Sequence, residues 1–188
     1  RDGRGAVVGA VESFRDLSIE ETLRKEIRDK YTFQDIVSKS HHMKRLFETL
    51  PLIASSQSTV LIEGESGTGK ELVAHTIHTL SDRKKQAFVA VNCGAVPETL
   101  FESEFFGHRK GAFTGADSHK EGLFDRAHRG ILFLDEVGEL SPMLQVKLLR
   151  ALELGEYMPL GSNTQKQVDV RIVAATNRNL DEQLRQQL

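Results

Sequence analysis

Apolar residues along this chain form short continuous runs that alternate with helical patterns. Four runs are dense in apolar and β-branched residues, which is typical of strands buried on both faces of a sheet. Between them, apolar residues recur three and four positions apart, which predicts amphipathic helices. The alternation favours an α/β fold with a central parallel sheet flanked by helices. The four predicted strands are residues 59–62, 87–91, 131–134 and 170–175.

Proline and glycine mark the ends of the helices between these strands. Pro97 begins one predicted helix, which carries Phe101 and Phe105 on one face together with Leu100, and Gly107 ends it. Further elements are expected as well: a helix from Pro142 to Gly155, a helix over about 118–128, a hairpin around 159–163, and a helix through Met43 and Leu50.

The first part of the chain has a different pattern. Residues 5–11 predict a strand, and Ser18 to Glu21 form a capping box for a helix with Ile19, Leu23 and Ile27 on one face. A strand that runs into such a helix resembles the end of a PAS sensor domain, and a solvated linker helix is the alternative. We therefore predict a sensor remnant and linker over residues 1–32 and a second domain over 33–188.

Composition narrows the classes of function. Lys and Arg number 25 and Asp and Glu 27 among 188 residues, so no general basic field indicates that this segment itself reads DNA. The single cysteine, Cys93, excludes an internal disulfide and fits a reducing cytoplasm. No apolar run approaches the length that spans a membrane.

A glycine-rich stretch follows the first predicted strand and opens a helical run. Its Gly-x4-Gly-Lys spacing between strand and helix predicts a phosphate-binding loop. The backbone N–H groups and the helix N-terminus would surround phosphate oxygens, and Lys70 would reach the β- and γ-phosphates of a nucleoside triphosphate. A glycine-rich turn without a ligand is the weaker alternative. The loop comprises Gly64, Glu65, Ser66, Gly67, Thr68, Gly69, Lys70 and Glu71.

Two carboxylates extend this prediction. Glu71 stands where Ser or Thr usually supplies a hydroxyl to Mg²⁺, so the metal needs another ligand. Asp135 ends an apolar strand and is placed to hold Mg²⁺, while Glu136 is placed to orient and deprotonate an attacking water. The pair favours a hydrolase over a kinase.

Two asparagines end the neighbouring strands. Asn177 could sense the γ-phosphate or position the water. Asn92 could hydrogen-bond Glu136 and hold it away from its water. The alternative for each is a strand-end cap. Pairs of histidines at 41–42 and at 75 and 78 lack a third ligand, so surface roles are favoured over a metal site.

The loop over residues 111–116 places one aromatic side chain among small residues and glycines. Phe113 has no periodic apolar neighbours, which indicates either an exposed contact for a partner or a buried loop tip. The loop comprises Gly111, Ala112, Phe113, Thr114, Gly115 and Ala116.

Three motifs together resemble the AAA+ domain of bacterial enhancer-binding proteins, the activators of sigma-54 RNA polymerase. They are residues 64–71, 111–116 and 132–136, and the resemblance runs from about Phe33 to Leu188. It implies a P-loop NTPase (AAA+) fold, incomplete at the C-terminus, and an ATPase that uses ATP and Mg²⁺ to remodel sigma-54 RNA polymerase for open-complex formation.

The resemblance also assigns roles to individual residues. It implies that Phe113 and Thr114 contact sigma-54, that Asn92 is the switch asparagine, and that Asn177 belongs to the first sensor. Glu71 is the usual residue in this family. Ile36 and Val37 match the segment that packs on adenine, although Ser38 replaces the expected glycine there.

Other implied parts concern the assembly. The family usually forms hexameric rings in which arginines reach the neighbour's γ-phosphate, and a helix-turn-helix domain binds DNA. We expect those arginines, a helical lid and the DNA-binding domain beyond Leu188. We therefore expect residues 1–188 alone to bind nucleotide poorly and to hydrolyse it slowly or not at all.

Two rival functions stay open at this point. One is an AAA+ ATPase that remodels another protein target, although a general pore loop needs the aromatic residue and not Thr114. The other is a non-catalytic regulator in which nucleotide only sets assembly. Asp135 and Glu136 argue against it, because a pure switch needs no carboxylate that activates water.

Overall fold

The structure is a computed structural model that describes residues 32–33, 36–37 and 40–178. The chain divides into two compact units, residues 1–44 and 45–188. In the first unit, β1 (Thr32–Phe33) pairs with β2 (Ile36–Val37) in antiparallel register. The predicted strand at 5–11 and the helix after Ser18 lie outside the described residues, and the predicted domain boundary at residue 32 stays a prediction.

A four-stranded parallel sheet forms the centre of the second unit. Its strands are β3 (Val60–Glu63), β4 (Phe88–Asn92), β5 (Ile131–Asp135) and β8 (Arg171–Thr176), in the order β3-β8-β5-β4. Every residue of β8 is buried, which is why this stretch is almost continuously apolar. The predicted α/β fold with a central parallel sheet is confirmed.

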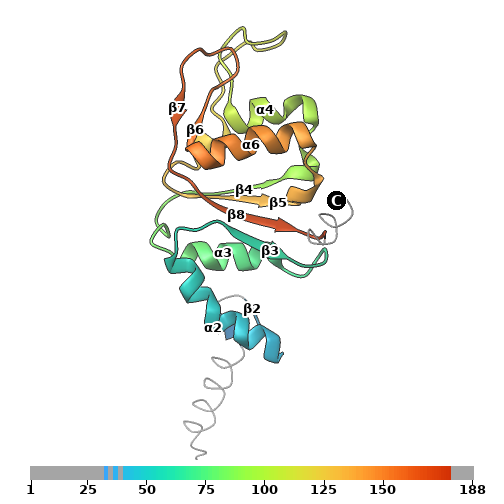
Figure 1. Cartoon of the computed structure of the whole chain (residues 1–188), viewed down its shortest axis with the longest axis vertical. Coiled ribbons are helices and arrows are strands. Elements are labelled where there is room, and N and C mark those ends of the chain that lie inside the picture. The colour runs from blue at the N-terminus through green and yellow to red at the C-terminus, as the bar shows by residue number, and fades with distance from the viewer. Residues whose placement is uncertain (1–31, 34–35, 38–39, 179–188) are drawn as a thin grey trace, which may run out of the picture. The chain divides into compact units, whose positions relative to one another are not determined.

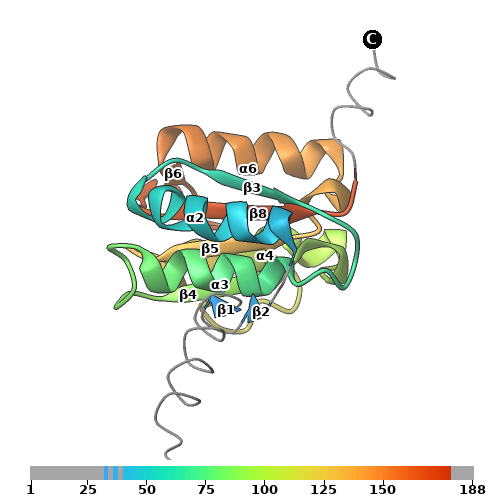
Figure 2. The ribbon, with the colours of Figure 1, turned by 90° about the horizontal axis from the view of Figure 1, so that it is seen from below.

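Helices cover both faces of this sheet. α4 (Glu98–Phe106) and α6 (Pro142–Leu154) lie on one face (Figure 1). On the other face lie α3 (Lys70–Leu80) and the part of α2 (His41–Ser55) from Arg45 onward (Figure 2). The sheet is therefore the middle of three layers, as in other doubly covered parallel sheets.

The main core lies between the sheet and the α4–α6 layer. Phe101 and Phe105 of α4 are fully buried and stack with their ring centroids 3.8 Å apart. Phe124 of the short helix α5 (Leu123–Arg126) and Leu144 and Leu148 of α6 complete this cluster. Leu100, which was predicted on the same face as the two phenylalanines, is instead 45% exposed.

Two shorter predictions have different outcomes. The hairpin around 159–163 is confirmed, because β6 (Glu156–Tyr157) pairs with β7 (Lys166–Gln167) in antiparallel register. The helix over about 118–128 is wrong for most of its length, since α5 covers only Leu123–Arg126. The reason is that His108 and Lys120 exchange two backbone hydrogen bonds of 3.0 Å, which holds the chain before α5 in an extended loop.

A buried arginine joins the sheet to the end of α2. Arg171 begins β8 and donates to the carbonyls of Ile53, Ala54 and Ser58 at 2.6, 2.8 and 3.3 Å. Those carbonyls lie at and beyond the last turn of α2, where most carbonyls have no partner within the helix. Arg171 thus links β8 to the end of α2.

Among the described residues, no helix is long and apolar enough to cross a membrane.

Candidate functional site

The loop after β3 has the backbone that phosphate binding requires. Gly67 and Gly69 have φ angles of 79° and 86°, a region that residues with a side chain rarely adopt. α3 begins directly at Lys70, and within the described residues the N–H groups of Gly67, Gly69 and Lys70 donate to no protein acceptor. The loop therefore offers unpaired donors at a helix N-terminus, which is a site for anions.

Lys70 lies at the mouth of this loop. Its Nζ donates to the carbonyls of Gly64 and Glu65, each at 2.8 Å. The Thr68 hydroxyl donates to the same Glu65 carbonyl at 2.8 Å, and so the turn is closed from within. A phosphate can replace these carbonyls as the partner of the ammonium group, because a charged oxygen is the stronger acceptor.

The other predicted site residues come together because all four strands are parallel. The register pairs Asn92 of β4 with Asp135 of β5, and Glu63 of β3 with Thr176 of β8. The backbone N–H of Gly64 donates to the Thr176 carbonyl at 3.1 Å, which fixes the phosphate loop to the end of β8. One edge of the sheet thus carries the loop at 64–70, Asn92, Asp135, Glu136 and Asn177. In open α/β sheets, ligands bind at this carboxyl edge.

Glu136 has an unusual backbone conformation. Its φ of 53° and ψ of 43° are left-handed, which costs free energy for a residue that is not glycine. The carboxylate Oδ1 of Asp135 accepts from the Glu136 N–H at 3.0 Å and stabilises this turn. The turn directs the Glu136 side chain toward Gly94, where a Cβ atom would lie 3.0 Å from its Oε2.

Asn92 approaches the same point from the other side. Its Oδ1 accepts from the Ala95 N–H at 3.0 Å and would lie 3.4 Å from a Cβ at Gly94. The strand-end cap that was considered for Asn92 is therefore present. Asn92 and Glu136 are not hydrogen-bonded to each other in the part of the chain that is described, so the switch role of Asn92 stays a prediction. Sequence reasoning missed Gly94, which keeps the space between the two side chains open.

The end of β8 is connected to the turn after Glu136. Arg178 forms an ion pair of 2.7 Å with Glu139, and its N–H donates to the Thr176 Oγ1 at 3.1 Å. Asn177 lies between these anchored residues and is exposed. No pattern in the sequence indicated the Arg178–Glu139 pair, because the two residues lie in separate connections that meet only in the fold.

The pKa of the Cys93 thiol reflects the charges at this edge of the sheet. Burial raises the pKa of its thiol to about 12, and the negative charges of Asp135 and Glu136 add to the effect. The thiol is therefore neutral at ordinary pH and is not a nucleophile. The same two carboxylates form an acidic surface beside the phosphate loop, which suits a divalent cation.

A Mg²⁺ ion fits this edge through Asp135. In the described ranges, no group of three or more His, Cys, Asp or Glu residues could hold a metal ion by itself. Mg²⁺ with a nucleotide usually takes one or two carboxylates together with phosphate oxygens and waters, so Asp135, at the same edge of the sheet as the phosphate loop, could hold the ion with them. Glu71 is exposed at the start of α3.

The remaining predicted binding residues lie elsewhere. Ile36 and Val37 form β2 in the first unit, and their predicted contact with adenine stays a prediction. His78 is buried and its Nε2 donates to the Gln86 carbonyl at 3.1 Å, with the ring of His75 packed against its edge. His75 is exposed, as predicted, but the surface role favoured for His78 is wrong, because this ring packs inside the fold and bonds to the backbone.

The Phe113 loop, residues 111–116, projects away from the layered core. Gly111 donates to the Ala116 carbonyl at 2.8 Å, and Ala116 donates to the Phe113 carbonyl at 3.0 Å. The Phe113 ring is 40% exposed and packs against the ring of the buried His108 in an edge arrangement, with centroids 5.0 Å apart. Thr114 is exposed beside it. The structure thus shows an exposed aromatic side chain on a closed loop and not a buried loop tip.

This geometry agrees with the similarity of the chain to known proteins. Residues 36–188 match the Sigma-54 interaction domain family. The chain is 53% identical over 163 residues to a Nif-specific regulatory protein of Azotobacter vinelandii, which covers 86% of this chain and 31% of that protein. It is 48% identical over 188 residues to a signal-transduction and transcriptional-control protein of Clostridium beijerinckii, covering 98% of this chain and 30% of that protein.

A solved structure shows the same fold. NtrX from Brucella abortus in complex with ADP aligns with a TM-score of 0.74 and 33% identity, over 90% of this chain and 38% of that one, and the same protein was also solved with ATP. The chain spans about a third of the length of the relatives that it matches. On the match over residues 36–188, this chain belongs to the Sigma-54 interaction domain family and contains the P-loop NTPase (AAA+) domain of sigma-54-dependent activators.

Proposed function

We propose that this chain is the motor part of a transcriptional activator that hydrolyses ATP and uses the reaction to remodel sigma-54 RNA polymerase. The observation that carries the proposal is the meeting of Lys70, Asp135, Glu136 and Asn92 at one edge of the sheet, in a domain that also presents Phe113. The bound nucleotides of NtrX from Brucella abortus support ATP and ADP as the ligands.

The chemistry requires positioning more than covalent participation. The loop N–H groups and Lys70 would hold the phosphates, and Asp135 would hold Mg²⁺, which neutralises charge on the transferred group. Glu136 would take a proton from the attacking water as the general base. Asn177, next to the anchored Thr176 and Arg178, would contact the γ-phosphate or the water. These roles rest on position at the sheet edge.

The connection from the site to the partner loop is short. Asn92 ends β4, and the 3-10 turn η1 (Cys93–Ala95) and α4 then lead directly to Gly107 and the Phe113 loop. Because Phe101 and Phe105 are fully buried, α4 is expected to move as a rigid element. A change in the relative position of Glu136 and Asn92 on hydrolysis would therefore shift Phe113 against its partner.

The assembled activator would contain more than this chain. We propose a hexamer-type ring with arginines from the neighbouring protomer, a cytoplasmic location, and DNA binding through a separate helix-turn-helix domain. Remodelling of another polypeptide remains the alternative, and the complete 111–116 motif with Thr114 beside Phe113 favours sigma-54.

A complex with sigma-54 tests the proposal. The full-length protein is mixed with sigma-54 and ADP plus a metal-fluoride mimic of the transition state, and complexes are separated by gel filtration. We expect a complex only with the mimic, and we expect Thr114→Ala to abolish it. Ser118→Ala, an exposed hydroxyl outside the motif on the same loop, is the matched control. An active ATPase that forms no complex with sigma-54 would contradict the proposed partner.

A further inference from the structure

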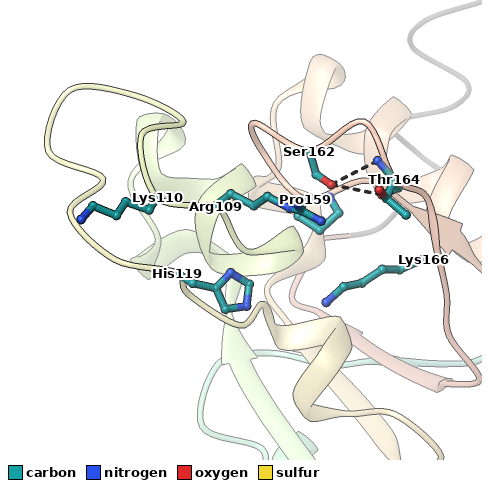
Figure 3. A pocket seen from close by; sticks show the side chains of 7 residues that line it. All are labelled: Arg109, Lys110, His119, Pro159, Ser162, Thr164 and Lys166. Carbon is teal, nitrogen blue, oxygen red and sulfur yellow. Dashed lines mark hydrogen bonds between the residues drawn. The ribbon is translucent and has the colours of Figure 1, made fainter.

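A cavity of about 550 Å³ lies at the foot of the Phe113 loop. One side is formed by the two ends of the loop that carries Phe113, and the other by the connection between β6 and β7 (Figure 3). His119 and Lys166 project toward each other from these two sides. The lining residues are Arg109, Lys110, His119, Pro159, Ser162, Thr164 and Lys166.

The walls of this cavity are held together by backbone contacts. Arg109 donates to the Leu160 carbonyl at 3.0 Å, and Leu160 donates to the Gly107 carbonyl at 3.0 Å. Gly161 approaches so closely that a Cβ atom there would lie 2.8 Å from the Cβ of Ala112. The cavity and the Phe113 loop are therefore parts of one connected structure, and the binding of a ligand in the cavity would depend on the position of the loop.

The lining is strongly basic. It contains no Asp or Glu, although Asp117 and Glu121 lie on the same loop outside it. Lys166 is paired with Asp125 at 2.7 Å, so its charge is largely compensated. Arg109 and Lys110 are exposed and have no ion pair among the described residues, which leaves two uncompensated positive charges.

His119 adds an oriented ring. Its Nδ1 lies 3.0 Å from the His108 carbonyl, which can only accept, so Nδ1 carries the hydrogen. The free Nε2 side of the ring then faces the cavity together with the hydroxyl-bearing turn at Ser162 and Thr164. The cavity thus combines a ring nitrogen and hydroxyl groups with its charged side chains.

We propose that this cavity binds an acidic segment of the polypeptide that the Phe113 loop engages, with carboxylates held by Arg109 and Lys110. The proposal rests on the proposed function for its partner. Arg109 suits a carboxylate because the guanidinium group binds one with two parallel hydrogen bonds. A concave space of this size fits side chains of a peptide. A duplex would require a broad basic surface, which a chain with a net charge of −2 does not indicate.

The test uses a fluorescein-labelled hexaglutamate peptide and the full-length protein, with binding followed by anisotropy. The pocket variant Arg109→Gln/Lys110→Gln is compared with Lys84→Gln/Lys85→Gln, which is also an exposed dibasic pair, in the turn before β4. We expect the pocket variant to lose about 10–100-fold in affinity, because two charged contacts are removed. The control pair is expected to bind like the wild type, and Arg109→Lys/Lys110→Arg is expected to retain most of the affinity.

Two results would overturn the proposal. One is equal affinity of the wild type and the pocket variant for hexaglutamate. The other is displacement of the peptide by a 20-base-pair DNA duplex that binds more tightly and loses affinity in the same variant, which would assign the cavity to nucleic acid. Because the peptide assay contains no sigma-54, it is separate from the test of the proposed function. Wild-type protein that binds hexaglutamate through Arg109 and Lys110 but never binds sigma-54 would support the cavity and reject the partner.

Discussion

Two loops rich in glycine and small residues occur in this domain, and they present opposite kinds of group. The loop at 64–70 directs unpaired N–H groups and the Lys70 ammonium toward a shared point. The loop at 111–116 pairs its own backbone through Gly111 and Ala116, and it presents the Phe113 ring to solvent. The first loop is built to surround a small anion, and the second to carry a side chain to a surface.

Glycine content alone therefore does not identify the function of a loop. In the phosphate loop, the positive φ angles of Gly67 and Gly69 turn backbone donors inward. In the Phe113 loop, glycines at both ends allow the chain to reverse, so that the residues between them stand clear of the core. The same residue type thus creates a binding backbone in one place and a support for a side chain in the other.

The largest effect is expected from replacing the lysine of the phosphate loop. Lys70→Ala removes the cation that the β- and γ-phosphates would contact, and we expect ATP affinity or turnover to fall about 10²–10³-fold. The measurement is calorimetric titration of ATP with a parallel ATPase assay on the full-length protein. Lys84→Ala, an exposed lysine away from this edge, should leave both values unchanged. Near-normal ATP binding by Lys70→Ala would mean that the loop holds phosphate differently.

Truncating phenylalanines should separate a core role from a surface role. Phe105→Ala empties a fully buried site and should lower the free energy of unfolding by about 3–5 kcal/mol. Phe113→Ala removes a ring that is 40% exposed and contacts His108 by one edge, so a loss below about 1.5 kcal/mol is expected. Urea unfolding followed by circular dichroism measures both values. A loss for Phe113→Ala as large as that for Phe105→Ala would show that the loop ring is structural.

The layered fold could be read from the sequence because each strand is a continuous apolar run. The runs of β5 and β8 exist because these strands are buried on both faces, and their short length and β-branched residues indicate strands and not buried helices. The two ends of α6, at Pro142 and Gly155, were also predictable from the backbone preferences of proline and glycine. The helix predicted over 118–128 was wrong for most of its length. The spacing of its apolar residues suits a helix, but the backbone of Lys120 hydrogen-bonds to that of His108 across the loop.

The site was predictable only in part, for a similar reason. Lys70, Asp135 and Glu136 stand in local sequence patterns whose position after a strand determines what they face. Gly94 matters because it leaves space free between two side chains, and the Arg178–Glu139 pair joins two connections that are distant in the sequence. Neither feature therefore produces a local sequence pattern. The basic cavity has the same origin, since Arg109 and Lys166 approach each other only after the hairpin folds.

Adding one methyl group at Gly94 tests whether hydrolysis depends on the position of the Glu136 carboxylate. A Cβ there would lie 3.0 Å from the Glu136 Oε2, which is closer than ordinary van der Waals contact, and would displace this carboxylate from its position. We expect Gly94→Ala to reduce the ATPase kcat about tenfold, because small displacements of a positioned base are costly. Gly111→Ala would not serve as a control, since Gly111 has a φ of 81°.

The suitable control for Gly94→Ala is Ala95→Ser, the next position in the same turn, which changes side-chain size without adding an atom at the Gly94 site. The ATPase assay is paired with calorimetric titration of ATP. Affinity for ATP should stay within about threefold, because the phosphate loop itself is unchanged. An unaltered kcat in Gly94→Ala would show that the open space between Asn92 and Glu136 has no part in the reaction.

The smallest effect is expected at Asp125, which forms an ion pair with Lys166 of the cavity lining. Burial raises the pKa of this carboxyl, but the hydrogen bond and charge of Lys166, together with the neighbouring Tyr157 hydroxyl and the Gly122 N–H, outweigh burial and hold the pKa below its ordinary value. The unfolded chain therefore binds the proton more readily. The stabilisation is present above about pH 4 and is lost as the pH falls through the folded-state pKa.

Asp125→Asn should thus flatten the acid side of the stability curve by at most about 1 kcal/mol, because the Lys166 partner is 39% exposed and solvent weakens the pair. The same change frees the Lys166 ammonium to face the cavity with Arg109 and Lys110, so hexaglutamate should bind a few-fold more tightly. Urea unfolding between pH 3 and pH 7 and the peptide titration read the two effects separately, with Glu153→Gln on the exposed side of α6 as the control. A stability change without a gain in peptide affinity would place Lys166 outside the anion site and confine that site to Arg109 and Lys110, on the same loop as Phe113.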